Sequence, residues 1–144
     1  MSLDALIDSN VLIAALNPEH QHHEPSAAVV AAEPRYVISV HSLSETYSCL
    51  TRAPWNRRPD EAMAAISALV GRNALRGLSA TEHYDALRRF AARGLAGPLL
   101  YDALIGEVAR LHGIPIIITW NLRHMTGLFP ELDVMTPAQF LHRA

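Results

Sequence analysis

The chain has 144 residues, 50% of them hydrophobic and 18% charged, with a formal net charge of -2 and a single cysteine, Cys49. This composition predicts one globular domain over residues 1–144 and argues against a disordered chain or a strongly basic surface. A single cysteine excludes an intramolecular disulfide and a thiolate zinc site. No apolar stretch approaches the roughly 20 residues that cross a bilayer, and no secretory signal is recognisable, so we expect a cytoplasmic protein with no membrane partner.

Short apolar runs alternate with helix-forming segments along the chain. The runs expected to be strands are residues 5–7, 36–40, 74–78, 115–119 and 133–135. Helices are expected between them, marked by capping residues, prolines and glycines at their ends. The runs are continuously apolar and lack a two-residue alternation, which favours a parallel sheet covered on both faces. We therefore expect a three-layer α/β/α sandwich with a mainly parallel central sheet.

Two polar residues directly follow predicted strands, at the edge where open parallel sheets collect their functional groups. Asp8 follows the first strand, and Asn121 lies just after the fourth. An ionised carboxylate in this position needs a partner, because little water should reach it. Asp8 also has a simpler interpretation as the N-cap of the next helix, although Ser9 or Asn10 would serve as well.

Two further acids lie on predicted helices. Glu45 stands three residues after Ser42, as in a capping box, so we weigh a structural role equally with a functional one. Asp102 lies in the very apolar helix of residues 99–112, where an unpaired carboxylate would cost several kcal/mol. Glu107 on the same helix points roughly 140° away from Asp102, and we expect it to face solvent.

The oxygens of Asp8, Glu45, Asp102 and Asn121 would form an all-oxygen ligand set. Such ligands suit Mg²⁺ or Mn²⁺ and do not suit zinc or copper. A divalent cation held there would orient a phosphodiester, activate water and stabilise the charge of an in-line displacement. The acids therefore predict metal-dependent nuclease chemistry.

Four segments resemble the motifs of the PIN domain, most closely those of VapC toxins from type II toxin–antitoxin pairs. They are residues 6–12 (LIDSNVL), 42–45 (SLSE), 101–105 (YDALI) and 118–121 (ITWN), in the family's order and approximate spacing. The resemblance covers nearly the whole chain. It implies a PIN-like fold, an Mg²⁺- or Mn²⁺-dependent endoribonuclease, inhibition by a cognate VapB-type antitoxin, and assembly as a homodimer.

By the same resemblance, Asp8, Glu45 and Asp102 are the acidic metal ligands, and Thr119 is the hydroxyl residue beside the site. Asn121 stands where the family often has aspartate. Because an amide binds a hard cation less strongly than a carboxylate does, this difference leaves occupancy of a second metal site open.

Aromatic and arginine side chains in a proline-bounded loop and beside Asn121 are candidate contacts to RNA, since rings stack on unpaired bases and guanidinium groups bind phosphate. The loop supplies Trp55, Arg57 and Arg58, and Trp120 and Arg123 flank Asn121. Asn10 is a further candidate substrate contact. An ordinary solvated loop is the alternative for residues 55–58. His20, His22 and His23 lie in a polar loop, and we do not expect them to hold a metal.

Two other functions fit part of the pattern. A phosphotransfer enzyme or receiver domain would use an aspartate after the first strand, but Asn10 stands where a second acid is expected and the chain contains no lysine. The stronger alternative is an inactive α/β module that only binds RNA or an antitoxin. Metal-dependent cleavage that is lost in Asp8→Asn or Asp102→Asn would separate the enzyme from this module.

Overall fold

The computed structural model describes residues 5–32 and 36–143. Five strands form one sheet, and every neighbouring pair is parallel. The strands are β1 (Ala5–Ile7), β2 (Val37–Ser39), β3 (Ala74–Arg76), β4 (Ile116–Ile118) and β5 (Asp133–Met135), arranged in the order β3-β2-β1-β4-β5. The parallel sheet confirms the predicted α/β class.

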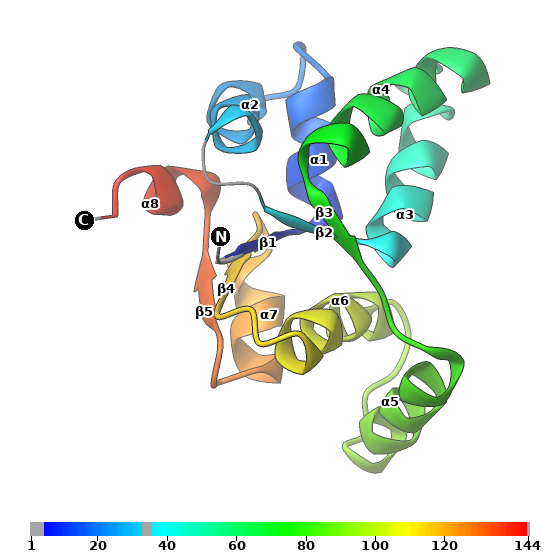
Figure 1. The fold of residues 1–144 in the computed structure, drawn as a ribbon, viewed down its shortest axis with the longest axis vertical. Helices are drawn as coiled ribbons and strands as arrows, with labels where there is room; N and C mark the ends of the chain where they lie inside the picture. The colour runs from blue at the N-terminus through cyan, green and yellow to red at the C-terminus, as the bar shows by residue number, and fades with distance from the viewer. Residues whose placement is uncertain (1–4, 33–35, 144) are drawn as a thin grey trace.

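Helices cover both faces of this sheet (Figure 1). One side carries α1 (Ser9–Leu16), α2 (His23–Ala31), α3 (Val40–Leu50) and α4 (Pro59–Arg72), with α8 (Pro137–Leu141) packed beside α2. The other side carries α5 (Ala80–Ala92), α6 (Leu99–Leu111) and α7 (Leu122–Leu128). The predicted three-layer sandwich is confirmed, and no helix in the described ranges is long and apolar enough to span a bilayer.

Alternate residues of β1 belong to two separate hydrophobic cores. Leu6 is buried with residues of α5, α6 and α7, including Phe90 and Ile105. Its neighbours Ala5 and Ile7 are buried against α1 and α2 on the other side. Because both faces of this strand are covered, all three of its residues are apolar.

β1 and β2 each run directly into a helix at the carboxyl edge of the sheet. Asp8 is the N-cap of α1, and its Oδ1 accepts a hydrogen bond from the next backbone N–H at 2.7 Å. Ser39 is the N-cap of α3, and its Oγ accepts from the His41 N–H at 3.2 Å. The predicted capping box of Ser42 and Glu45 is therefore wrong. Because β2 ends one residue earlier than expected, α3 begins at Val40, and Glu45 lies in its second turn.

Glu107 on α6 corrects a second expectation, because it is fully buried and does not face solvent. Arg89 of α5 donates to its Oε2 at 3.1 Å, and Arg110 donates through Nε to its Oε1 at 2.9 Å. Burial alone would raise the pKa of Glu107, but the hydrogen bonds from both arginines outweigh it and hold that pKa below its usual range. The side of α6 opposite Asp102 is thus covered by α5.

The sequence does not predict α7. This helix has only seven residues, and one of them is Gly127. Because glycine has a low helix propensity, the sequence pattern of so short a helix is weak. Its formation matters for the site, because α7 begins immediately after Asn121 and carries Arg123 and His124.

Candidate active site

Asp8 lies at the centre of a hydrogen-bonded network at the carboxyl ends of β1 and β4, and only 1% of its surface is exposed. Thr119 Oγ1 donates to its Oδ2 at 2.7 Å, and Asn10 Nδ2 donates to the same oxygen at 3.2 Å. Burial, together with the charge of Asp102, raises the pKa of Asp8 to about 6 against the lowering effect of the Thr119 hydrogen bond. Asp8 is therefore fixed in place but incompletely compensated.

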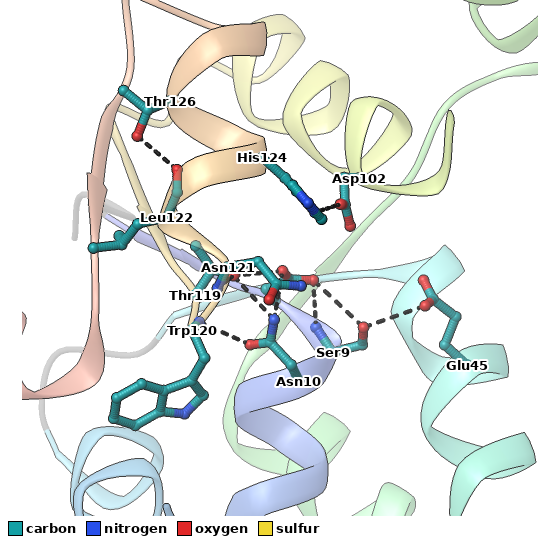
Figure 2. A network of polar contacts seen from close by, with 11 residues as sticks. Ser9, Asn10, Glu45, Asp102, Thr119, Trp120, Asn121, Leu122, His124 and Thr126 are labelled. Atoms are coloured by element: carbon teal, nitrogen blue, oxygen red, sulfur yellow. Dashed lines mark hydrogen bonds and ion pairs between the residues drawn. The ribbon is translucent and has the colours of Figure 1, made fainter. Parts of the chain in front are cut away.

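Thr119 and Asn10 hold this network together, as Figure 2 shows. Thr119 Oγ1 accepts from Asn10 Nδ2 at 3.1 Å and from the Asn121 N–H at 3.0 Å. Asn10 Oδ1 accepts from the Trp120 N–H at 3.0 Å. Both side chains thus position Asp8 and join α1 to the end of β4. A contact between Asn10 and substrate stays a prediction, since its amide already has partners within the protein.

Glu45 approaches Asp8 from α3. Its Oε2 lies 3.4 Å from Ser9 Oγ, which lies 3.4 Å from Asp8 Oδ1, so this hydroxyl lies between the two carboxylates and can donate its one proton to either. The other oxygen, Oε1, is 3.5 Å from His41 Nε2, and both of these buried atoms lack a hydrogen-bond partner among the described residues. Burial raises the pKa of Glu45, and the charges of Asp8 and Asp102 add to that effect.

Asp102 approaches the same region from the first turn of α6, across the sheet from α3 (Figure 2). Its Oδ2 lies 3.4 Å from His124 Nδ1 of α7. Burial raises the pKa of Asp102, whereas the charge and hydrogen bonding of His124 lower it, and the net direction is upward. The helix dipole and one histidine therefore do not compensate this carboxylate fully.

The three acids form one electrostatic cluster whose ligand chemistry fits a hard divalent cation. Among the described residues, the only basic side chains within 4.0 Å of these carboxylates are His41 and His124, which carry charge only when protonated. Burial lowers the pKa of His41, and the charge of His83 lowers it further, so His41 is poorly suited to compensate Glu45. No three histidine, cysteine, aspartate or glutamate side chains within residues 5–32 and 36–143 are already arranged to hold a metal ion. The donor set thus suits the metal, but its carboxylates are not arranged in this conformation to share one ion.

Asn121 and Arg123 are both exposed at the start of α7. Asn121 is the N-cap residue of α7, but its side chain makes no capping hydrogen bond. Its amide oxygen is therefore available to a metal, as predicted for this position. Metal ligation by Asn121 and RNA contact by Arg123 stay predictions.

The arginines of the loop of residues 55–58 form hydrogen bonds within the protein. Arg57 donates to Asn17 Oδ1 at 3.0 Å, and Arg58 donates to Asp60 Oδ2 at 2.8 Å. Asn17 follows the last residue of α1, whereas Asp8 precedes the first, and eight helical residues span about 12 Å. The structure therefore does not bring Arg57 to the acids, and contact between RNA and this loop stays a prediction.

The two tryptophans among the candidate RNA contacts belong to one run of neighbouring rings. His22 stacks on Trp120 with ring centroids 4.0 Å apart, and His20 lies 5.7 Å from His22 and 6.0 Å from Trp55. Trp120 Nε1 also donates to Ser26 Oγ at 3.0 Å. His20 and His22 thus pack against aromatic rings.

His41 and His124 are site residues that the sequence interpretation missed. His41 stands four residues before Glu45, a spacing that places both on one face of a helix. That signal was available once the helix start was known. His124 gave no such signal, because its contact with Asp102 depends on how α7 packs against α6.

Comparisons with known proteins identify the family and the fold. The model of the PIN domain family matches residues 5–124. Ribonuclease VapC40 of Mycobacterium tuberculosis is 33% identical over 118 residues, which are 81% of this chain and 85% of that protein. The crystal structure of VapC20 from Mycobacterium tuberculosis, described as a toxin that cleaves the sarcin–ricin loop, has a TM-score of 0.71 and 19% identity over 86% of this chain and 95% of its own.

A second solved structure, DNA-bound VapBC from Salmonella typhimurium, has a TM-score of 0.65 and 20% identity over 94% of this chain and 99% of its own. At these identities the two structures support the fold alone. The family rests on the match over residues 5–124 and on the curated relative. This chain belongs to the PIN-domain family, among its VapC-type ribonucleases.

Proposed function

We propose that this VapC-type ribonuclease, the toxin of a toxin–antitoxin pair, hydrolyses RNA with Mg²⁺ or Mn²⁺ held by Asp8, Glu45 and Asp102. The observation that carries the proposal is a cluster of three carboxylates with raised pKa values and no arginine partner among the described residues. Gathering like charges in a partly buried site costs free energy unless a cation joins them.

A bound cation would orient the scissile phosphate, lower the pKa of a water molecule and stabilise charge in the displacement. Asp8 would be its fixed ligand, because Thr119 and Asn10 hold that carboxylate in one orientation. Glu45 Oε1 has no hydrogen-bond partner among the described residues, so it is suited to accept the proton of the attacking water. Asn121 would add a fourth oxygen from the start of α7.

The direct test is cleavage of total cellular RNA by the purified chain. We expect fragments with Mg²⁺ or Mn²⁺, none with EDTA, and none from Asp8→Asn or Asp102→Asn variants whose circular dichroism matches that of the wild type. Cleavage by both variants at the wild-type rate would refute the metal mechanism. A folded wild type that binds RNA but never cleaves it would favour the inactive binding module instead.

The proposed partner is a cognate VapB-type antitoxin. Support comes from structural neighbours such as the VapBC complex of Salmonella typhimurium. Co-expression with the adjacent upstream reading frame should restore growth and yield a copurifying complex. Failure of both would contradict the toxin assignment. The homodimer stays a prediction, which light scattering of the purified chain would check.

A further inference from the structure

A pocket of about 500 Å³ opens beside Glu45, between α1, α3 and the start of α6. We call it the Glu45 pocket, and the lining residues that matter here are Ser44, Glu45, Ser48, Cys49, Arg52 and Tyr101. Its volume falls within the roughly 300–1,000 Å³ of small-molecule sites. Because Glu45 belongs both to the acid cluster and to the pocket wall, a group bound in the pocket lies next to the proposed site of cleavage.

One stripe of α3 and the turn after it supplies most of the wall. Ser44, Glu45, Ser48 and Arg52 follow one another at spacings that place them on the same side of a helix. Arg52 is exposed, and its guanidinium has no hydrogen bond or ion pair with any residue of the described ranges. Unlike Arg57, Arg52 is therefore free to bind an anion that enters the pocket.

Tyr101 supplies an aromatic surface on the α6 side, one residue before Asp102. It is 49% exposed, and its ring stacks on that of His41 with centroids 5.3 Å apart and an angle of 13° between the planes. His41 therefore covers one face of the ring and fixes its orientation. The remaining surface is open to an unpaired base, which stacks readily on such a ring.

We propose that the Glu45 pocket binds the nucleotide next to the scissile phosphate of single-stranded RNA, with its base on Tyr101 and an adjoining phosphate on Arg52. The inference rests on the proposed function, which places a phosphodiester at the acids. The hydroxyls of Ser44 and Ser48 are suited to hydrogen bonds with a base edge or a ribose 2′-OH. A free guanidinium beside an open ring matches a nucleotide better than it matches an apolar peptide.

The test measures binding of a labelled mixed-sequence RNA decamer by fluorescence anisotropy in EDTA. An Asp8→Asn background prevents cleavage and removes one repelling charge. In that background, Tyr101→Leu should weaken binding by about fivefold or more. Arg52→Gln should reduce the slope of log affinity against log salt by about 0.7, the value for one lost phosphate contact on a single strand.

Arg72→Gln is the matched control for charge. Arg72 is also exposed, but it lies at the end of α4, donates to the Ala31 carbonyl and does not line the pocket. The control changes net charge by the same amount as Arg52→Gln and should leave the salt slope unchanged.

Cys49 reports occupancy directly, because it lines the pocket and is the chain's single cysteine. Saturating RNA should slow its alkylation by N-ethylmaleimide several-fold. An RNA concentration near the wild-type Kd should protect Cys49 less in the Arg52→Gln variant, because a smaller fraction of that variant is bound.

The outcomes separate this inference from the proposed function, since binding in EDTA requires neither metal nor cleavage. Equal salt slopes for Arg52→Gln and Arg72→Gln, or unchanged alkylation of Cys49 at saturating RNA, would overturn the pocket assignment. Loss of antitoxin binding in Tyr101→Leu with unchanged RNA affinity would assign the pocket to a peptide, and would also overturn it. Absence of any RNA cleavage by the wild type would instead refute the proposed function.

Discussion

Helix α6 carries two acids in opposite surroundings. Glu107 is fully buried, yet Arg89 and Arg110 bind its carboxylate and lower its pKa. Asp102, five residues earlier, is partly exposed, yet its pKa is raised and its nearest cationic group is His124. The fold places two arginines beside Glu107, the acid buried within the packed helices. It places no arginine beside the acids at the sheet edge, as expected for carboxylates that bind a metal ion from solution.

The largest difference between the two acids should appear in activity. We expect Asp102→Asn to lower RNA cleavage by roughly 10²-fold or more, because the metal loses a ligand that stabilises the transition state. Glu107→Gln should keep near wild-type cleavage per folded molecule. Initial rates with Mg²⁺, normalised to the folded fraction, provide the measurement. Equal losses in the two variants would remove the distinction between a catalytic and a structural acid.

The acid cluster also predicts how stability depends on pH in EDTA. The pKa of Asp8 is about 6 in the folded chain against an ordinary 3.8, so the folded state binds this proton more tightly than the unfolded state. Protonation of Asp8 therefore stabilises the folded state, and this contribution is complete below pH 4. It is lost as pH rises through about 6, which lowers the free energy of unfolding by on the order of 2–3 kcal/mol. The raised pKa values of Glu45 and Asp102 act in the same direction.

Urea unfolding between pH 4 and 8 measures this dependence. Asp8→Asn should flatten the decline, because the variant has no charge to form at this position. Glu107 acts in the opposite direction, since its pKa is lowered, and its contribution is lost only as pH falls below the ordinary range of a glutamate. Because the pKa values of His20 and His41 are lowered, these two residues make stability rise with pH over part of this range, so the comparison with the variant decides. A pH dependence of stability that is the same in Asp8→Asn and in the wild type would contradict the raised pKa of Asp8.

Stability should distinguish Glu107 from an ordinary surface acid. We expect Glu107→Gln to lower the free energy of unfolding by about 2 kcal/mol, because it breaks charged hydrogen bonds from two arginines. The effect is limited because both arginine side chains are partly exposed and can turn to water. Glu19→Gln, a change at an exposed acid, should alter stability by less than about 0.5 kcal/mol. Equal effects would show that the buried pairs contribute little.

The smallest predicted effect concerns the support of Asp8. Thr119→Val removes the hydroxyl that donates to Asp8, so the pKa of that carboxyl should rise further. We expect about tenfold lower activity near neutral pH and an acid limb of the rate profile shifted to higher pH. Thr126→Val is the control, since Thr126 is exposed and donates only to the Leu122 carbonyl (Figure 2). An unshifted profile in Thr119→Val would mean that this hydrogen bond does not tune the site.

Much of the fold could be predicted because the junctions between strands and helices are marked locally. Asp8 follows three buried residues and caps α1, so both of its proposed roles are visible in one short segment. The capping box at Ser42 failed because two serines compete for the start of α3, and the outcome depends on where β2 stops. Removing that box takes away the structural explanation of Glu45 and strengthens its place in the acid cluster.

Pairings between distant elements could not be predicted from spacing. The contact of Glu107 with Arg89 requires α5 to lie against α6, and the contact of Asp102 with His124 requires α7 to form at all. Periodicity indicates which side of a helix is apolar, but it does not identify the charged side chain that faces a given acid. The same limit concealed the internal pairing of Arg57 and the free guanidinium of Arg52.

We propose that Asp8, Glu45 and Asp102 bind a divalent cation. Thermal unfolding with increasing Mn²⁺ tests this proposal most directly. Ligand that binds only the folded state raises Tm. We predict that Mn²⁺ clearly raises the Tm of the wild type and of Glu107→Gln, although the Tm of Glu107→Gln without metal should be lower. Mn²⁺ should raise the Tm of Asp102→Asn very little. An equal Mn²⁺-dependent rise in Asp102→Asn and the wild type would contradict the account.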